Sequence, residues 1–334
     1  MNIRRLLVGL AWVGAGAVLV RGVSGSCNVA SSLRWLASRP RAGQRTDRPC
    51  FLFVLPMLRE QRLIESAIER FHGMAVEWGA ACVAVVTTER EYAEAAPDCG
   101  DTPTPDLAAA LAERFGPVVR HYHVPDAGAI MVDQVNFAVR LELKRLANEG
   151  IDARRVFVAV YNADSRPDPR TLSAVAALAA ADSDVRVVQQ SALFTEGLGR
   201  HGATADGIAL LQSRWTLARE IPRLRRQAAQ ARRGTSRWPR LAHCVGHGLF
   251  VRGDVLQEFV GLPTTTMNED LAFGYLLCAA GVPIVPVPLL EFGDSPSTII
   301  GSIRQTRQWF WSYPEYPRAH GLAAAAGLGT PRTR

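Results

Sequence analysis

The sequence predicts an α/β protein in which a mostly parallel β-sheet is flanked by helices. Short apolar runs rich in β-branched residues, typical of strands buried on both faces, occur at residues 51–55, 81–86 and 156–160. Segments with helical periodicity lie between them, including residues 58–78 and 133–148. Strands and helices that alternate at this spacing are typical of parallel sheets with helical crossover connections.

Each further element follows from a local pattern. The first strand ends at Pro56, and the second stops at Thr87-Thr88-Glu89. The segment 203–233 reads as one long helix in which Pro222 is a candidate break. The other predicted elements are a helix at 107–115, a strand at 118–124, a helix at 170–181, a strand at 185–191, a short strand at 249–252 and a capped helix at 264–281.

The basic residues are concentrated at the front of this 334-residue chain. Residues 1–48 hold eight arginines and one aspartate, whereas basic and acidic residues balance in the remainder, so the net charge of +7 belongs to the front end. A globular part without net charge does not predict a nucleic-acid groove.

A membrane anchor is predicted over residues 1–24. Leu6 to Val20 carry no charge, and residues 3–23 are just long enough to span a bilayer core of about 30 Å when flanking arginines reach the headgroups. The alternative is a signal peptide cleaved near residues 23–25. Arginines after this segment outnumber those before it, and the six cysteines lack the spacing of a disulfide framework. We therefore expect a single-pass membrane protein with its downstream domain in the cytoplasm.

Three further regions follow the anchor. Residues 25–48 are predicted to be a basic juxtamembrane linker that lies on anionic membrane lipid. Residues 49–318 form the globular domain, and residues 319–334 are predicted to be a tail.

The strand at 156–160 stops abruptly at Asn162-Ala163-Asp164. Ligands of open α/β sheets bind beyond the carboxyl ends of the strands. A carboxylate at Asp164, two residues from the amide of Asn162, can hold a divalent cation such as Mg²⁺ or Mn²⁺, which in turn binds phosphate oxygens. The alternative interpretation of Asp164 is an Asx turn at a strand end.

Three downstream segments, taken in order with this strand end, form a recognisable pattern. Residues 243–252 are a glycine-bearing turn before a strand, residues 264–281 are a helix containing Glu269-Asp270-Leu271, and residues 304–311 contain glutamine, arginine and tryptophan. In this order the segments resemble the large inverting glycosyltransferase group with the GT-A fold, often called family 2, which includes polysaccharide synthases. The resemblance covers roughly residues 51–312.

The resemblance implies a role for each matching position. Asp270 matches the catalytic base, although acidic residues also favour helix N-termini for electrostatic reasons. Asn162 and Asp164 match the Asp-x-Asp motif that binds the metal and the sugar diphosphate. Nucleotide-sugar contacts are further implied for Pro56, Glu60 and Glu89, and acceptor contacts for Gly246, His247, Gly248, Glu269, Arg307 and Trp309.

The chain departs from the family pattern at three places. Asn162 replaces the first aspartate of the metal motif, which removes a negative charge. Thr87-Thr88-Glu89 stands where the family has Asp-Asp or Asp-Gly-Ser near the nucleotide base. Arg307 lies one residue early in the motif that contains Trp309.

The predicted function is a membrane-anchored, inverting glycosyltransferase of the hexosyltransferase type. One carboxylate suffices as a base when no covalent intermediate forms, and a divalent cation neutralises the leaving diphosphate. We expect a nucleotide-sugar donor and a polysaccharide or lipid-linked acceptor. A single anchor cannot export a polymer, so either transfer is non-processive or a membrane partner supplies the pore.

The competing prediction is a catalytically impaired GT-A-like protein that binds or scaffolds within a polysaccharide-synthesis complex. Asn162 and the altered end of the second strand favour that alternative, and Asp270 disfavours it. A sugar nucleotidyltransferase would need a glycine-rich loop after the first strand, and residues 56–60 are not one.

Overall fold

A single eight-stranded sheet forms the centre of the computed structural model, which describes residues 3–38, 48–94, 102–234, 240–311 and 314–328. The strand order is β3-β2-β1-β4-β7-β6-β8-β5. The strands are β1 (Cys50–Pro56), β2 (Ala81–Thr88), β3 (Val119–Val124), β4 (Val156–Val160), β5 (Arg166–Pro167), β6 (Val187–Leu193), β7 (Leu249–Arg252) and β8 (Ile284–Phe292).

The sheet is mixed, although six of its eight strands run in one direction, in line with the predicted mostly parallel sheet. Strands β3, β2, β1 and β4 are parallel, as predicted, and β6 is parallel to β8. Strand β7, however, runs antiparallel to both of its neighbours, β4 and β6, and β5 is antiparallel to β8.

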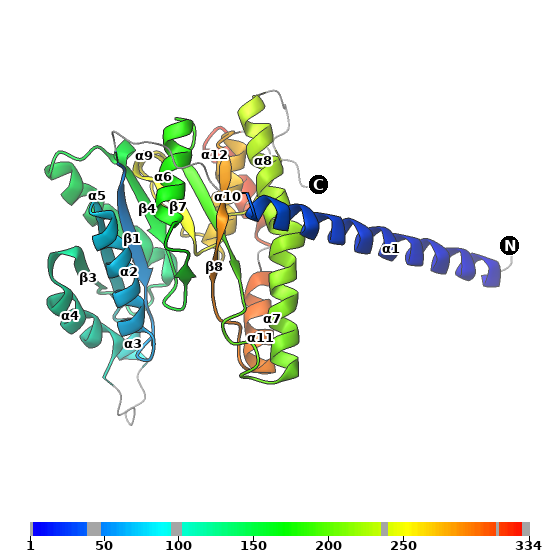
Figure 1. Ribbon diagram of the computed structural model, residues 1–334, viewed down its shortest axis with the longest axis horizontal. Coiled ribbons are helices and arrows are strands. Elements are labelled where there is room, and N and C mark those ends of the chain that lie inside the picture. The colour runs from blue at the N-terminus through cyan, green and yellow to red at the C-terminus, as the bar shows by residue number, and fades with distance from the viewer. Residues whose placement is uncertain (1–2, 39–47, 95–101, 235–239, 312–313, 329–334) are drawn as a thin grey trace.

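Helices cover both faces of the sheet (Figure 1). Alternate residues of β1 enter two separate cores: Leu52 and Val54 pack with α5, α10 and α12, whereas Phe51, Phe53 and Leu55 pack with α2, α4 and α6. The helices are α1 (Ile3–Leu36), α2 (Ile64–Trp78), α3 (Arg90–Ala93), α4 (Thr104–Phe115), α5 (Met131–Asn148), α6 (Thr171–Ala181), α7 (Ala203–Trp215), α8 (Ile221–Arg233), α9 (Gly253–Glu258), α10 (Glu269–Ala279), α11 (Ile299–Phe310) and α12 (Tyr316–Ala325).

The long helix predicted at residues 203–233 is present, with one irregularity. A π-helical segment, η3 (Thr216–Glu220), joins α7 directly to α8. Pro222 lies in the first turn of α8, immediately after this segment, and does not end the helix.

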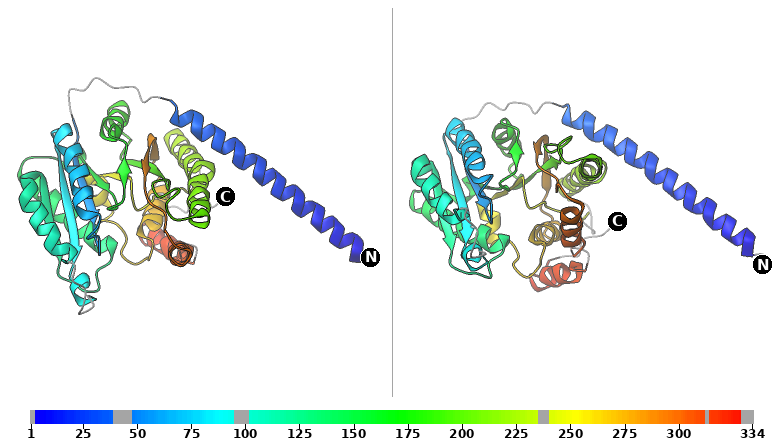
Figure 2. Two further views of the ribbon diagram at one scale, coloured as in Figure 1. Left: turned by 60° about the horizontal axis from the view of Figure 1, so that its bottom comes forward. Right: turned by 90° about the horizontal axis from the view of Figure 1, so that it is seen from below.

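Helix α1 leaves the domain as an isolated rod (Figures 1 and 2). Only its C-terminal part packs on the domain, where Ser32 is buried. Residues 25–36 of the predicted linker thus continue the helix, while residues 39–47 lie outside the described residues. In the described part of the chain we find no helix with the combined length and apolarity of a membrane span. The predicted anchor therefore stays a prediction.

The C-terminal segment also belongs to the domain in its described part. Ala319 and Ala323 of α12 are buried in the core that contains α10, whereas the sequence predicts a tail from residue 319. Alanines supply little of the hydrophobic signal that marks a buried helix in a sequence. Residues 329–334 of that predicted tail lie outside the described residues.

Gly274 permits the close approach of α10 to the loop before β7. A Cβ atom at this position would lie 2.6 Å from the backbone nitrogen of Cys244 and 3.0 Å from Cα of His243. We predict that Gly274→Ala lowers the free energy of unfolding by about 1–3 kcal/mol, because backbone must move to admit the methyl group. Urea unfolding of the purified protein measures this change.

Gly73 provides the matched control for that prediction. It lies inside α2 with no neighbour within 4 Å of an added Cβ, so Gly73→Ala should raise the free energy of unfolding by about 0.5–1 kcal/mol. Equal stabilities of the two variants would contradict the packing argument.

Candidate active site

The pairing of β4 with β7 brings two of the predicted site segments to one edge of the sheet. Val160, the last residue of β4, pairs with Leu249, the first residue of β7. Because the two strands are antiparallel, the loop that follows β4 and the loop that precedes β7 meet at this edge. Asn162 and Asp164 therefore lie in the same region as Gly246, His247 and Gly248.

Asp164 is held in a tight turn after β4. The turn is closed by hydrogen bonds in both directions between Asn162 and Ser165. The backbone N–H of Asp294, in the loop between β8 and α11, donates to Oδ2 of Asp164 at 3.2 Å. Glu60 lies nearby, since burial and then the charge of Asp164 raise the pKa of Glu60 to about 7. A cation bound at this point would relieve the repulsion between the two carboxylates.

Gly248 allows the loop before β7 to approach β6. Its φ is +62°, and a Cβ atom would lie 2.5 Å from the carbonyl oxygen of Gln190. The buried side chain of Gln189 then fixes the loop, because its amide nitrogen donates to the His247 carbonyl and its oxygen accepts from the Val245 N–H. No pattern in the sequence distinguishes Gln189 from any other residue of a buried strand.

Asp270 and Glu269 begin α10 directly beside this loop. A Cβ atom at Gly246 would lie 3.6 Å from Oδ2 of Asp270 and 3.8 Å from Oε1 of Glu269. Burial raises the pKa of the Asp270 carboxyl, although backbone N–H groups that include that of Gly246 partly offset the effect. Burial and the neighbouring Asp270 raise the pKa of Glu269 to about 7. Both carboxyl groups thus take up protons more readily than exposed ones.

His247 connects the two acidic parts of the site. Its Nδ1 pairs with the buried carboxylate of Glu291 on β8. Burial alone would lower the pKa of His247, but Glu291 and, less strongly, Asp164 raise it to about 9, so the imidazole is positively charged at neutral pH. This charge in turn lowers the pKa of Asp270. Asp164 and Asp270, more than a hundred residues apart in the chain, therefore act on the same imidazole.

The other predicted site residues differ in how their elements are connected to this cluster. Arg307 and Trp309 lie on exposed α11, which contacts the start of α10 through a hydrogen bond from Asn268 to the Gln308 carbonyl. Pro56 ends β1 beside Val86 at the same edge of the sheet. Glu89 is exposed and bonds to His123, away from Asp164.

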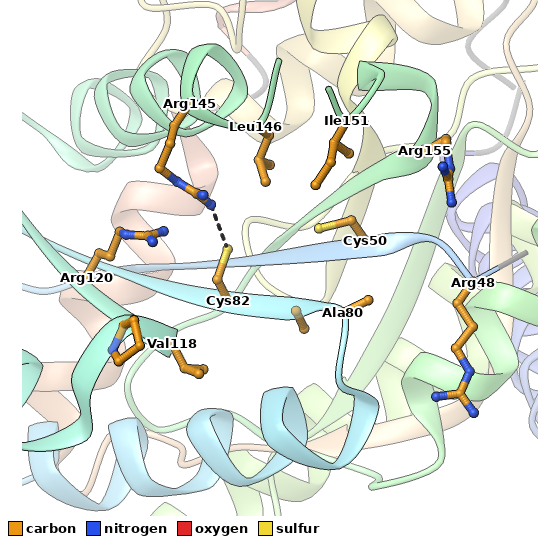
Figure 3. Close-up of a pocket in the computed structure, with 12 residues that line it drawn as sticks. Arg48, Cys50, Ala80, Cys82, Val118, Arg120, Arg145, Leu146, Ile151 and Arg155 are labelled. Carbon is orange, nitrogen blue, oxygen red and sulfur yellow. Dashed lines mark hydrogen bonds between the residues drawn. The ribbon is translucent and has the colours of Figure 1, made fainter. Parts of the chain in front are cut away.

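A hollow lies at the opposite end of the strands (Figure 3). It has a volume of about 320 Å³ and includes Cys50 and Ala81, the first residues of β1 and β2. Four arginines, Arg48, Arg120, Arg145 and Arg155, line it, and Arg145 donates to Sγ of Cys82 at 3.8 Å. None of the predicted site residues takes part, so this hollow is separate from the candidate active site.

The described residues hold no ready-made metal site of three or more histidine, cysteine or acidic side chains. The residues that are present fit a shared cation, in which Asp164 supplies a carboxylate and phosphate oxygens of a substrate supply further ligands. Asn162 contributes a neutral amide where a second charge would strengthen binding.

Comparison with known proteins connects this geometry to a family. Residues 157–328 match the family model described as glycosyl transferase family group 2. Mannosyltransferase PcManGT from Pyrobaculum calidifontis, solved with GDP-Man and Mn²⁺, aligns at a TM-score of 0.57 and 17% identity, over 91% of this chain and 74% of that chain. No curated protein matches the sequence.

A second solved structure is similar over a smaller region. S. aureus TarS 1-349, in complex with UDP-GlcNAc, aligns at a TM-score of 0.45 and 13% identity, over 76% of this chain and 60% of that chain. The mannosyltransferase likeness shows that the two chains share a fold, with a mixed sheet flanked by helices.

Glu269 and Asp270 begin α10, and the charge of one should affect the pKa of the other. We predict that Asp270→Asn lowers the pKa of Glu269 from about 7, because the substitution removes the adjacent negative charge while burial still favours the protonated form. Carboxyl ¹³C NMR titration measures the shift. Glu315→Gln is the control, since its charge is a weaker cause of the Glu269 shift. A Glu269 pKa that is the same with and without Asp270 would contradict the observed geometry.

Proposed function

The chain belongs to glycosyl transferase family group 2 and has a GT-A-like fold, and on this premise we propose that it transfers a sugar, with inversion, from a nucleotide-sugar donor to a glycan or lipid-linked acceptor. The observation that carries the proposal is the meeting of Asp164, His247 and Asp270 at one edge of the sheet. In this reaction a proton passes to a base and a diphosphate leaves. A cluster of acidic residues around the His247 imidazolium provides groups for both events.

Asp270 has the position and the chemistry of the general base. In the proposed reaction an acceptor hydroxyl oxygen bonds to the anomeric carbon, and the bond from that carbon to the diphosphate breaks. The hydroxyl proton passes to the Asp270 carboxylate, while the electron pair of the broken bond stays on the diphosphate. Burial raises the pKa of Asp270, so the carboxylate is a stronger base than an exposed aspartate. Oδ2 of Asp270 lies beside Gly246, in the loop that we assign to the acceptor.

The donor is assigned to the loop after β4 and its neighbours. Asp164 and Glu60 would hold a divalent cation, Mg²⁺ or Mn²⁺, together with the donor phosphates, and when bound the cation neutralises negative charge on the leaving diphosphate. The nucleotide would lie near Pro56 and Glu60. The neighbouring structures were solved with GDP-Man and UDP-GlcNAc, so guanosine and uridine donors are the first to test.

The alternative function is a GT-A-like binding or scaffold protein of a polysaccharide-synthesis complex, and one observation favours it. The hydroxyl of Thr87, at the end of β2, lies 2.7 Å from His121 Nε2 and 3.0 Å from His123 Nδ1. This strand end is thus occupied with internal hydrogen bonds where the family pattern offers an acid to the nucleotide base. Turnover measurements distinguish the two functions.

A membrane location is the second part of the proposal. Helix α1 projects from the side of the domain formed by α7 and α8 (Figures 1 and 2). Helices α7 and α11 are joined by a hydrogen bond between Gln212 and Gln305, and each exposes large apolar side chains. These are Leu210, Leu211 and Trp215 on α7 and Ile299, Ile300, Ile303, Trp309 and Phe310 on α11.

This apolar surface and α1 together suit a lipid bilayer with the domain on its cytoplasmic side. Arg304 and Arg307 on α11 are placed to contact anionic headgroups. The acceptor end of the site, which includes α11, would then open at the bilayer, where a lipid-linked acceptor resides. A polymer product would require a separate membrane partner for export.

Two substitutions should separate donor binding from chemistry. In a thermal-shift panel of GDP and UDP with Mn²⁺, we expect the unaltered chain to be stabilised in a metal-dependent way and Asp164→Ala to lose that stabilisation. Asp270→Asn should keep the stabilisation but lower sugar-nucleotide turnover about 10²- to 10⁴-fold, because only the base is removed. Radiolabelled sugar transfer or donor hydrolysis measures turnover.

Chelator provides the control for the metal. Equal stabilisation with EDTA present would count against the cation at Asp164. Stabilisation by nucleotides without any turnover of the unaltered chain would favour the scaffold alternative.

The exposed face of α11 should contact lipid independently of α1. We predict that Ile300→Glu with Ile303→Glu weakens the quenching of Trp309 and Trp311 fluorescence by brominated lipids in vesicles of anionic composition. The background is the full chain with Trp12→Phe, Trp35→Phe and Trp215→Phe, so that quenching within α1 and α7 does not contribute. Val76→Glu is the control, because Val76 is comparably exposed but lies on α2. Quenching that is unchanged by the α11 substitutions would exclude lipid contact at this face.

A further inference from the structure

The π-helical segment η3 is the place where α1 is fixed to the domain. A π-turn shifts backbone carbonyl groups out of the regular helical hydrogen-bond pattern, and such turns are frequent at functional sites. Here the Leu217 carbonyl accepts a hydrogen bond from Ser32 Oγ at 2.7 Å, and the Ala218 carbonyl accepts one from Asn28 Nδ2 at 3.1 Å. Two polar side chains of α1 thus bind directly to the backbone of η3. The fully buried position of Ser32 agrees with this role.

The last residue of η3 is Glu220, and it is turned into the interior of the domain. Only 8% of Glu220 is exposed, and its Oε1 has no hydrogen-bond partner among the described residues. Burial raises the pKa of Glu220 to about 7. A buried carboxylate oxygen without a partner destabilises the fold.

Glu220 lies close to the pair formed by His247 and Glu291. The charges of His247 and Glu291 both act on Glu220, and Glu220 acts on His247. Glu291 is almost fully buried, and its Oε2 also has no hydrogen-bond partner in the described part of the chain. The imidazole of His247 therefore pairs with the buried carboxylate of Glu291 and is also within the electrostatic influence of Glu220.

The charged groups around His247 come from four elements of the fold. Glu220 belongs to η3, Glu291 to β8, Asp164 to the loop after β4, and Asp270 to α10. Of these four acids, Asp164 and Asp270 are assigned to donor and acceptor chemistry. Glu220 and Glu291 have no role in that chemistry, and Glu291 pairs directly with the imidazole.

We propose that Glu220 and Glu291 hold His247 as a fixed cation for the donor diphosphate, and that α1 sets the position of Glu220 through η3. His247 would donate a hydrogen bond to the diphosphate, and it neither gains nor loses a proton when the sugar is transferred. Its charge would stabilise the electron pair that the diphosphate receives from the broken bond. The inference rests on the proposed function. It assigns His247 to the donor, whereas the family resemblance implies an acceptor contact.

This arrangement accounts for the neutral residue in the metal motif. Asn162 leaves the motif with one acid and hence a weaker hold on a divalent cation. An imidazolium at His247, 85 positions after Asn162, supplies positive charge to the same end of the sheet. Part of the neutralisation of the diphosphate would then come from the protein itself.

The decisive experiment is an NMR titration of His247 in the full chain, combined with nucleoside-diphosphate binding in EDTA. Glu220→Gln keeps the shape of the side chain but removes its charge, so the pKa of His247 should fall from about 9 and the metal-free affinity for GDP or UDP should weaken at pH 8. Glu291→Gln should cause the larger pKa shift because Glu291 pairs directly with the imidazole. His247→Gln should abolish most of the metal-free affinity, with a loss of about tenfold or more, as expected for a hydrogen bond to a charged group.

The contribution of α1 has its own matched pair of variants. Ser32→Ala with Asn28→Ala should move the His247 titration in the same direction as Glu220→Gln, because both carbonyl contacts to η3 are lost. Ser26→Ala should leave it unchanged, since the Ser26 hydroxyl bonds to the Gly22 carbonyl of its own helix and not to η3 in the described part of the chain. A pKa of His247 that is the same in the Ser32/Asn28 variant as in the unaltered chain would overturn the role of α1.

The outcomes separate this inference from the proposed function. If the unaltered chain binds no nucleoside diphosphate with or without Mn²⁺, the proposed function fails. If it binds them but Glu220→Gln changes neither the His247 titration nor the metal-free affinity, only the role of Glu220 is excluded. Circular dichroism and urea unfolding of each variant show whether the fold is retained, and Glu291→Gln reports on His247 independently of η3.

Discussion

The antiparallel pairing of β4 with β7 is the constraint on which the candidate site depends. The register of that pairing places the turn that holds Asp164 beside the loop that holds His247. Gly248 makes the register possible, because any side chain there would collide with the Gln190 carbonyl. The same loop passes Asp270 at the start of α10. The site is therefore assembled by backbone geometry at a few positions, and the chemistry of its side chains follows from their enforced proximity.

Burial of acidic groups is the second property that organises this region. Glu60, Glu220, Glu269 and Asp270 all have raised pKa values, and burial is the main cause for each. The pKa of His247 is also raised, but the cause is different: its acidic neighbours raise the pKa, whereas burial alone would lower it. Repulsion among these closely placed acids raises the electrostatic free energy of the site. A bound cation or an anionic substrate would change that free energy. The hollow at the other end of the strands has the opposite character, with four arginines.

Much of the fold follows from local sequence patterns. The apolar runs that became β1, β2 and β4 fill both faces of the sheet, and the segment from Ala203 to Arg233 is one continuous helix as predicted. The direction of β7 was not predictable, because an apolar run of four residues does not reveal which way it crosses the sheet. The α12 helix was missed because its buried side chains are alanines.

The candidate site likewise contains some residues that the sequence predicts and others that it does not. Asp164 and Asp270 stand out because acids follow a strand or begin a helix within a recognisable order of segments. Gln189, Glu220 and Glu291 could not be found in this way. Each is a polar residue inside an otherwise ordinary strand or helix, and its importance depends on partners 27 or more positions distant, such as His247 for Glu220. The π-turn likewise has no pattern of its own in the sequence around Thr216.

The attachment of α1 has a practical consequence for where the chain can be shortened. A recombinant form that starts at the first strand would discard Asn28 and Ser32 and would also remove Trp35, over which the Arg225 guanidinium stacks at 5.4 Å. It would uncover the surface of η3 and α8 and leave two backbone carbonyls without their donors. A form that begins just before Gly25 keeps these partners and omits most of the projecting rod, and so preserves the domain as the structure shows it.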